Sequence, residues 1–175
     1  MNKFLFLKKK YFLYIKIYTD GSCLGNPGIG GYAIIIKTYY YNKYFLVGKF
    51  LLTTNNRMEL KAIINAIIIL KKYFNYYFIV YLFTDSKYVI NSINNKNIIK
   101  WYNNNFKKIK NSDLWLKLIN INIYKEKILF FWIKSHFKNI NNIKCNNLAK
   151  KATKNKKIII DYKYVDIKKK KIYIN

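Results

Sequence analysis

Tyr18-Thr19-Asp20-Gly21-Ser22-Cys23-Leu24-Gly25-Asn26-Pro27-Gly28 lies between two apolar, β-branched stretches, at about 12–19 and 31–37. Five of the six glycines of the chain fall between Gly21 and Gly31. Glycine tolerates positive φ angles and allows a close approach of the backbone, so the segment predicts a turn that joins two strands as a hairpin. Asp20 then stands where the first strand ends. The simplest alternative role for Asp20 is to cap the turn.

The rest of the chain alternates between predicted strands and helices. Further strands are predicted at about 44–52, 77–83 and 128–133, and helices at about 57–70, 86–94, 97–106, 112–124 and 142–154. Apolar residues fall on one face of the first helix and of the last: Leu60, Ile63, Ile64, Ile67 and Ile68, and Cys145, Leu148, Ala149 and Ala152. The order of elements predicts an α/β (α+β) fold with a five-stranded mixed sheet flanked by helices.

The 175 residues suffice for one domain with a substantial core. That domain is expected at 12–155, between a short N-terminal extension at 1–11 and a basic, loosely ordered C-terminal tail at 156–175. No apolar run approaches the roughly 18 residues of a membrane-spanning helix, and the start lacks the h-region of a secretory signal. We therefore expect a cytoplasmic protein that does not enter a membrane, with Cys23 and Cys145 as free thiols.

Basic residues outnumber acidic ones 34 to 7, which gives a formal charge of +27. A polyanionic partner such as a nucleic acid is one explanation, because neutralising phosphates releases counterions. The alternative is compositional bias, since Lys, Asn, Ile and Tyr are favoured by an A/T-rich genome. The rarest residues are then informative: the only arginine is Arg57, the only proline Pro27 and the only histidine His136. They lie in a few short segments, in or beside which three of the seven acidic residues stand.

Three acidic residues, Asp20, Glu59 and Asp85, stand at the ends of predicted elements. Each has a simple structural explanation: the helix dipole favours Glu59 in a first helical turn, and Asp85 can cap the helix that follows it. If the strands before Asp20 and Asp85 are neighbours in the sheet, however, the three carboxylates converge. Clustered carboxylates repel one another and raise one another's pKa values, and divalent cations such as Mg²⁺ resolve this repulsion. An acidic cluster on a very basic protein is the electrostatic arrangement of a metal-dependent nuclease.

Five segments, in the same order and with nearly the same spacing, resemble bacterial type 1 ribonuclease H. They are 19–28, 54–59, 84–89, 113–115 and 132–149, within a similarity that extends over about 14–154. The resemblance implies a ribonuclease H-like sheet of three antiparallel and then two parallel strands. It also implies that Asp20, Glu59 and Asp85 hold two Mg²⁺ ions, for which Mn²⁺ can substitute. The reaction would cut the RNA strand of an RNA–DNA hybrid and leave 3′-hydroxyl and 5′-phosphate ends.

Two features near the C-terminal end of this similarity concern catalysis. His136 corresponds to the family's histidine that assists proton transfer or product departure; its alternative is a surface histidine without a role. The family's fourth carboxylate position is Asn146 here, and the following Asn147 brings no acid either. An amide oxygen can still ligate a hard cation, but it brings no negative charge. We therefore expect a weaker second metal site, with activity retained at higher Mg²⁺ or with Mn²⁺. The loop around His136 also departs from the family, which leaves the timing of product release open.

Recognition of the hybrid is expected to depend on shape, because an A-form minor groove exposes 2′-hydroxyl groups. By the resemblance, Thr54 contacts a phosphate of the DNA strand, and other polar side chains line the groove. These groove residues are Cys23, Asn26, Asn55, Asn56 and Lys87. The segment at about 98–111 resembles the family's basic protrusion in shortened form, and its alternative is an ordinary amphipathic helix and loop. Its aromatic and basic residues include Trp101, Phe106, Lys107, Lys108 and Lys110.

The leading interpretation is a monomeric endoribonuclease that acts on RNA–DNA hybrids and binds them with a strong dependence on salt. The alternative is a hybrid-binding protein with weakened or lost catalysis, which Asn146 favours. A nuclease or integrase with the same fold and another substrate is a third interpretation, and the asparagine-rich groove segments argue against it.

Overall fold

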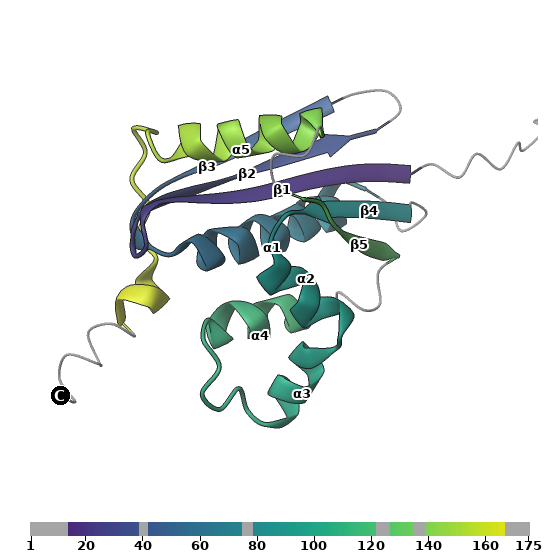
Figure 1. The fold of residues 1–175 in the computed structure, drawn as a ribbon, viewed down its shortest axis with the longest axis vertical. Helices are drawn as coiled ribbons and strands as arrows, with labels where there is room; N and C mark the ends of the chain where they lie inside the picture. Colours follow the sequence, from purple (N-terminus) through teal and green to yellow (C-terminus); the bar gives the residue numbers. More distant parts are fainter. Residues whose placement is uncertain (1–13, 39–41, 75–78, 122–126, 135–138, 167–175) are drawn as a thin grey trace, which may run out of the picture.

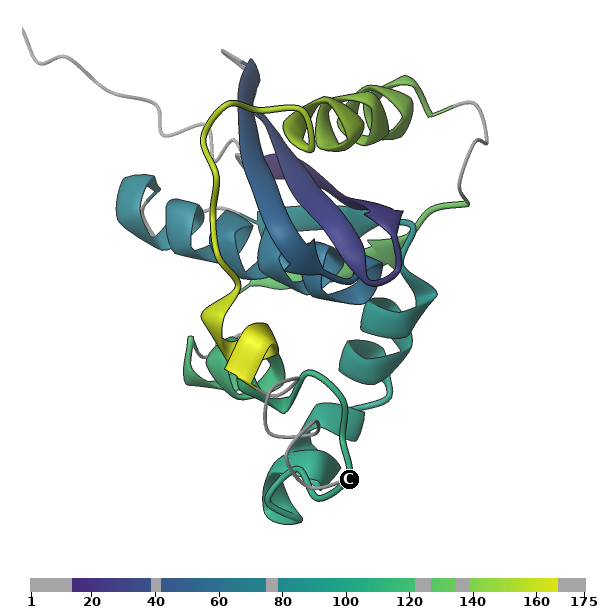
Figure 2. The same ribbon diagram turned by 90° about the vertical axis from the view of Figure 1, so that its left-hand side faces the viewer.

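The computed structural model describes residues 14–38, 42–74, 79–121, 127–134 and 139–166. They form a five-stranded sheet in the order β3-β2-β1-β4-β5, with helices on both faces (Figures 1 and 2). The pairs β1–β2 and β2–β3 are antiparallel, and the pairs β1–β4 and β4–β5 are parallel. The elements are β1 (Tyr14–Gly25), β2 (Gly28–Lys37), β3 (Asn42–Thr53), α1 (Asn55–Tyr73), β4 (Ile79–Thr84), α2 (Lys87–Asn94), α3 (Asn97–Asn103), α4 (Ser112–Asn120), β5 (Ile128–Trp132) and α5 (Ile140–Ala152). The predicted fold class and element order are confirmed.

β1 and β2 form the hairpin that the glycine-rich segment predicts, with Gly25 opposite Gly28 and a φ of 79° at Gly25. β1 is longer than expected, so Asp20 lies inside the strand opposite Ala33 and not at its end. The prediction was wrong here because the glycines, which usually mark a loop, continue the ladder with β2. On its other side, β1 pairs with β4 only as far as Tyr18. Asp20 therefore lies just beyond the last parallel pair, at the edge where β4 ends.

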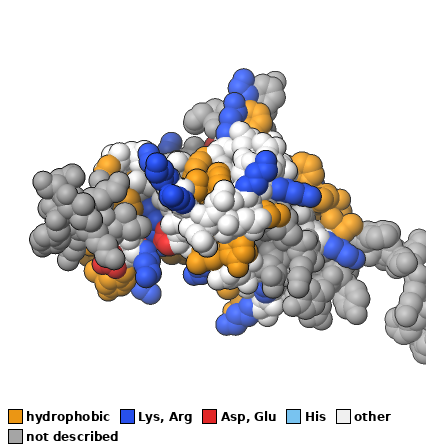
Figure 3. Space-filling view, turned by 90° about the horizontal axis from the view of Figure 1, so that it is seen from below, with side chains coloured by type: hydrophobic (Ala, Val, Ile, Leu, Met, Phe, Trp, Pro, Cys, Tyr) orange, Lys and Arg blue, Asp and Glu red, His pale blue; other side chains and the backbone are white. Residues whose placement is uncertain are grey.

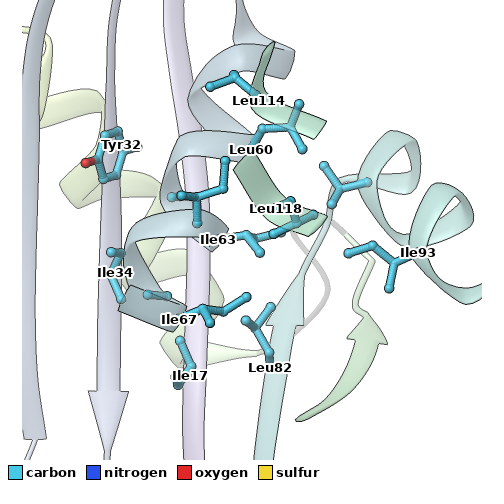
Figure 4. Packing of buried hydrophobic residues seen from close by; sticks show 14 of the residues in the cluster. Ile17, Tyr32, Ile34, Leu60, Ile63, Ile67, Leu82, Ile93, Leu114 and Leu118 are labelled. Carbon is cyan, nitrogen blue, oxygen red and sulfur yellow. The ribbon is translucent and has the colours of Figure 1, made fainter. Parts of the chain in front are cut away.

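α1 begins at Asn55, because the Thr54 hydroxyl caps it by accepting a hydrogen bond from the Arg57 N–H. This start is two residues before the predicted one, so Glu59 lies in the second turn and not in the first. The apolar face of α1 packs on the sheet and on α2 and α4 (Figure 4), where each buried aliphatic side chain stabilises the fold by about 1.5–3 kcal/mol. Residues of this core include Ile17, Ile34, Leu60, Ile63, Ile67, Leu82, Ile93, Leu114 and Leu118. Ile68 departs from the prediction and is 36% exposed.

α5 covers the opposite face of the sheet (Figure 1). Its small residues Cys145 and Ala149 pack against Tyr18, Ala33 and Ile35. Small side chains allow the helix to lie close to β1 and β2, so the apolar stripe predicted for this helix is confirmed. None of the helices within the described ranges is long and apolar enough to cross a membrane.

The segment 156–166 packs against the domain, contrary to the expectation of a loosely ordered tail. Ile159 forms a parallel bridge with Phe50 of β3, and its N–H donates to the Lys49 carbonyl at 2.9 Å. Asp161, which follows, is 3% exposed. The chain thus leaves α5 on one face of the sheet, passes the β3 edge and reaches α4 on the other side (Figure 2). The expectation was wrong for 156–166 because the partners of this segment lie far back in the sequence and leave no local signal.

Candidate active site

Asp20, Glu59 and Asp85 converge at one edge of the sheet. Each offers a carboxylate oxygen, and these oxygens lie within 4.8 Å of one another. Asp20 comes from β1, Glu59 from α1, and Asp85 from the residue after β4. Asp20 and Glu59 are only 4% and 3% exposed, and Asp85 is half-buried. The convergence that the sequence predicts is confirmed.

Gly21 determines how closely α1 approaches β1 at this point. A Cβ at Gly21 would lie 2.6 Å from the Glu59 backbone nitrogen and 2.9 Å from the Met58 Cβ. These distances are too short for real contacts, so a larger residue would push the helix away from the strand. The Gly21 backbone also donates to the carboxylates of Asp20 and Glu59. Gly21 therefore sets the separation of these two acids.

The electrostatics of the cluster favour a bound cation. Burial, followed by the charge of Asp85, raises the pKa of Asp20 to about 8. Burial and the charges of Asp20 and Asp85 hold the pKa of Glu59 well above its usual range. Asp20 Oδ2 and Glu59 Oε2 are buried without a hydrogen-bond partner among the described residues. Such buried atoms are rare in proteins, and a hard divalent cation would satisfy them and relieve the repulsion. The three carboxylates thus fit a site for a hard divalent cation.

α5 passes beside the cluster at Cys145. Burial, and then the charges of Asp20, Glu59 and Asp85, raise the pKa of this thiol well above its usual range. Its Sγ instead contacts backbone carbonyl oxygens of β1 and β2, at 3.4 and 3.5 Å. A protonated thiol engaged in this way is not a metal ligand.

The family's fourth acidic position lies on the same part of α5. Asn146 follows Cys145 and is half-buried, whereas Asn147 is exposed. Lys150, one turn later, lowers the pKa of Asp20 by its charge. At the position of Asn146, α5 therefore brings no negative charge to the cluster. The metal-binding role of Asn146 stays a prediction. His136 lies outside the described residues, so its predicted role is untested.

Trp132 of β5 holds the turn that carries Asp85. Its indole N–H donates to the Asp85 carbonyl at 3.0 Å. The ammonium group of Lys87, one of the predicted groove residues, lies 4.9 Å from the centroid of the Trp132 ring. Trp132 was found from the sequence only as the start of a family-like segment. Trp132 lies at the end of a predicted strand, and Asp85 also follows the end of a strand. This shared position is the signal that could have indicated that Trp132 supports the turn that carries Asp85.

Arg57 connects α1 to α4 and to the C-terminal segment. Its side chain is 1% exposed and donates to Asp113 at 2.7 and 2.8 Å, to Asp161 at 2.7 and 2.9 Å, and to Asn111 Oδ1 at 3.4 Å. These bonds occupy the five N–H donors of a guanidinium. The network fixes the N-terminal end of α1 two residues before Glu59. The sequence marks Arg57 as unique but gives no indication of these partners.

Most of the predicted groove residues lie together at the N-terminal end of α1. Asn26 Oδ1 accepts a hydrogen bond from the Asn55 N–H at 3.2 Å, which ties the β1–β2 turn to the helix. Asn26, Thr54 and Asn56 line a groove of about 690 Å³. Cys23 is half-buried on the adjoining end of β1. The structure therefore places these residues on one surface, and their binding roles stay predictions.

The predicted protrusion consists of α3 and the residues up to 111. Trp101 is half-buried and packs edge-on against the buried Trp115, with ring centroids 5.5 Å apart. Lys107 and Lys108 are exposed. Seen from this side of the molecule, lysine side chains project at several points and acidic side chains are few (Figure 3). Trp101 thus supports the protrusion by packing, while Lys107 and Lys108 of the protrusion face solvent.

Known proteins are similar to this chain over most of its length. The RNase H family model matches residues 14–154. Ribonuclease HI of Pasteurella multocida is 42% identical over 146 residues, which cover 81% of this chain and 90% of that protein. Ribonuclease H of Campylobacter jejuni is 43% identical over 139 residues, which cover 79% of this chain and 90% of that protein.

Solved structures share the fold. LC9-RNase H1, described as a type 1 RNase H with the type 2 active-site motif, has a TM-score of 0.71 and 25% identity, and the match covers 81% of this chain and 72% of that chain. LC11-RNase H1 in complex with an RNA/DNA hybrid has a TM-score of 0.55 and 24% identity over 79% of this chain and 98% of that chain, which supports the fold alone. With the family match and the bacterial relatives, these findings establish that the chain belongs to the bacterial type 1 ribonuclease H family and is a ribonuclease H enzyme.

Proposed function

We propose that this ribonuclease H is an endonuclease that hydrolyses the RNA strand of RNA–DNA hybrids and leaves 3′-hydroxyl and 5′-phosphate ends. The observation that carries the proposal is the cluster of Asp20, Glu59 and Asp85, whose ligand oxygens lie within 4.8 Å of one another. Two buried oxygens of this cluster have no hydrogen-bond partner within the described part of the chain. The names of the relatives, ribonuclease HI and ribonuclease H, support the choice of activity.

The three carboxylates are proposed to hold two Mg²⁺ ions, for which Mn²⁺ can substitute. Oxygen ligands of this kind suit hard cations, and binding would offset the burial and the charge of Asp85 that raise the pKa of Asp20. When bound, the ions supply Lewis acidity at the scissile phosphate and at the leaving 3′ oxygen. Asn146 is proposed to contribute an uncharged oxygen, so the second ion is held more weakly. His136 is proposed to assist proton transfer or product departure.

The surface around the cluster is proposed to position the hybrid. Short polar side chains at the N-terminal end of α1 would contact the minor groove and the DNA-strand backbone, and exposed lysines would neutralise phosphates. The polar residues are Cys23, Asn26, Thr54, Asn55 and Asn56, and the lysines are Lys87, Lys107 and Lys108. Because the lysines act through charge, affinity should fall steeply with salt.

Cleavage of a labelled hybrid tests the proposed function. The protein should cut the RNA strand only when a divalent cation is present and should leave double-stranded DNA of the same sequence intact. Asp20→Asn should abolish cleavage while hybrid binding persists, because the variant removes a carboxylate and leaves the groove unchanged. Asp166→Asn, at an exposed acid of the C-terminal segment, is the matched control and should cleave normally.

Asn146 favours a second candidate, a hybrid-binding protein without catalysis. Such a protein would bind the hybrid but would not cut it at any concentration of Mg²⁺ or Mn²⁺. The metal titration of the native chain therefore separates the two candidates. The monomeric state and the cytoplasmic location stay predictions.

A further inference from the structure

The segment 156–166, which lies outside the family match, contributes a wall to the groove at the N-terminal end of α1. One side of the groove consists of Asn26, Thr54 and Asn56, and another of residues 108–112. The C-terminal segment adds Tyr164, and the buried Arg57 also borders the groove. The groove is therefore formed by four separate parts of the chain: the β1–β2 turn, the start of α1, residues 108–112 and the C-terminal segment.

Tyr164 is held firmly in this wall. Its N–H donates to the Asp161 carbonyl at 2.9 Å, and the Asp161 carboxylate is bound by Arg57 and by the Thr53 hydroxyl. The Arg57 guanidinium lies 5.4 Å from the centroid of the Tyr164 ring. Tyr164 is half-buried, whereas Tyr162, two residues earlier, is 69% exposed. The ring is thus positioned by α1 through Arg57 and not only by its own segment.

The groove offers mainly hydrogen-bond donors to a ligand. Asn26 Oδ1 already accepts from the Asn55 N–H, and Thr54 Oγ1 accepts from the Arg57 N–H. What these side chains can offer a ligand in addition is chiefly an amide N–H and a hydroxyl O–H. Exposed Lys108 and Lys110 line the opposite side, and an ammonium group only donates. Such a surface fits the anionic sugar-phosphate backbone of a nucleic acid.

Arg57 cannot supply a further contact to this backbone, because Asp113, Asp161 and Asn111 occupy its donors. Tyr164 lies over Arg57 and carries an uncharged donor at this place. Burial raises the pKa of Tyr164 above its ordinary value, although the charge of Arg57 acts in the opposite direction. The phenol therefore keeps its proton at neutral pH.

We propose that Tyr164 is a substrate-binding residue whose hydroxyl donates a hydrogen bond to a backbone phosphate of the bound hybrid. The C-terminal segment then forms part of the substrate surface, in addition to its packing on β3 and α1. This proposal rests on the proposed function, since it assumes that a hybrid occupies the groove.

Tyr164→Phe tests the proposal, because it keeps the ring over Arg57 and removes only the hydroxyl. KM for the hybrid should rise roughly 10-fold, as expected for one lost hydrogen bond to a charged group, with kcat near the native value. The dissociation constant, measured in the non-cleaving Asp20→Asn background, should rise by the same factor. Tyr162→Phe is the matched control and should change neither quantity.

Salt dependence distinguishes this contact from those of the lysines. Removal of an uncharged donor should weaken binding equally at all salt concentrations and leave the slope of log affinity against log salt unchanged. Lys108→Ala should instead reduce that slope by about 1. A smaller slope in Tyr164→Phe would contradict the assigned contact.

Unchanged KM and dissociation constant in Tyr164→Phe would overturn the proposal. A lower melting temperature as the only effect would also overturn it, because Tyr164 would then serve packing on Arg57 alone. Failure of the native protein to cut any hybrid would defeat the proposed function instead. In that case the binding titrations in the Asp20→Asn background would still decide the role of Tyr164.

Discussion

Asp20 of β1 and Asp85, the residue after β4, occupy equivalent positions relative to the register of these two neighbouring parallel strands. Tyr18 of β1 pairs with Phe83 of β4, and each aspartate follows two residues later in its own stretch of chain. The paired rings are also stacked, with centroids 5.0 Å apart. Because parallel strands advance together, this register brings both carboxylates to the same edge of the sheet. The register of β1 and β4 is therefore what assembles two of the three acids.

The metal-free protein should lose stability as the pH rises from about 4 to about 8. Asp20 has an ordinary pKa of 3.8 and a pKa of about 8 in the folded protein. Between these values the folded protein keeps a proton that the unfolded chain has released, so the free energy of unfolding falls as the pH rises. In EDTA, the melting temperature should thus be lower at about pH 8 than at about pH 5.

Two comparisons check the cause of this pH dependence. Asp20→Asn cannot ionise, so it should reduce the dependence to the part that the raised pKa of Glu59 contributes, and it should melt above the native protein at the higher pH. Mg²⁺ should raise the melting temperature of the native protein there, because it binds only the folded state. Burial raises the pKa of Asp161, but hydrogen bonds from Arg57 more than compensate and hold it below its ordinary 3.8. The stabilisation that Asp161 contributes is therefore lost only when the pH falls below about 4, outside this range. A native melting temperature that rises across the range would contradict the prediction.

Asn146→Asp should lower the Mg²⁺ concentration needed for cleavage. The added carboxylate lies on the part of α5 that borders the cluster, and a unit charge pair near a protein surface interacts by about 1–4 kcal/mol. We therefore expect the half-maximal Mg²⁺ concentration to fall by at least about 5-fold. Asn147→Asp adds the same charge at the neighbouring exposed position and should have little effect. Equal metal requirements in Asn146→Asp and the native chain would rule out this account.

The element order and the acidic cluster could be predicted because their signals are local. Glycine clustering marked the hairpin, and the apolar period of α1 marked its buried face. The sequence predicted each acid at the end of an element, and the ends of adjacent parallel strands meet, so convergence followed once β1 and β4 were taken as neighbours. Asp20 was misplaced at a strand end because the glycines that continue the β1–β2 ladder look like a loop.

Contacts between distant residues leave no such signal. Arg57 and Asp161 are 104 positions apart, and nothing near either residue indicates the pair. Tyr164 is one of 18 tyrosines in a lysine-rich segment, so the sequence does not distinguish it. The mixture of lysines and aromatics around Trp101 is the same whether the ring packs on Trp115 or contacts nucleic acid. Only the tertiary structure separates these possibilities.

Gly21→Ala should weaken both the fold and the metal site. The new methyl group would lie 2.6 Å from the Glu59 nitrogen, so α1 must move away from β1 and carry the Glu59 carboxylate from Asp20. Overpacking of this kind destabilises by about 1–3 kcal/mol, which urea denaturation measures. The half-maximal Mg²⁺ concentration for cleavage should rise in parallel. Ser22→Ala, next to it in β1, adds no atoms and is the control. Native stability and metal requirement in Gly21→Ala would contradict the close contact.

Asp161→Ala should destabilise the protein and also raise KM. Asp161 is buried against Arg57 and is the ion partner of Lys61 at 3.3 Å. Breaking a buried pair by removing one partner costs about 3–5 kcal/mol, and we expect the lower part of this range because Asp113 still binds Arg57. Asp166→Ala, at an exposed acid of the same segment, should change the free energy of unfolding by no more than about 0.5 kcal/mol.

The two effects of Asp161→Ala have separate origins in the structure. Stability is lost because Arg57 and Lys61 lose a partner, and KM rises because Asp161 anchors the turn that presents Tyr164 to the groove. Tyr164→Phe should produce only the second effect: it should raise KM with little change in the unfolding midpoint. If Asp161→Ala loses stability but keeps the native KM under conditions where it is fully folded, the C-terminal segment supports the fold and does not contribute to substrate binding.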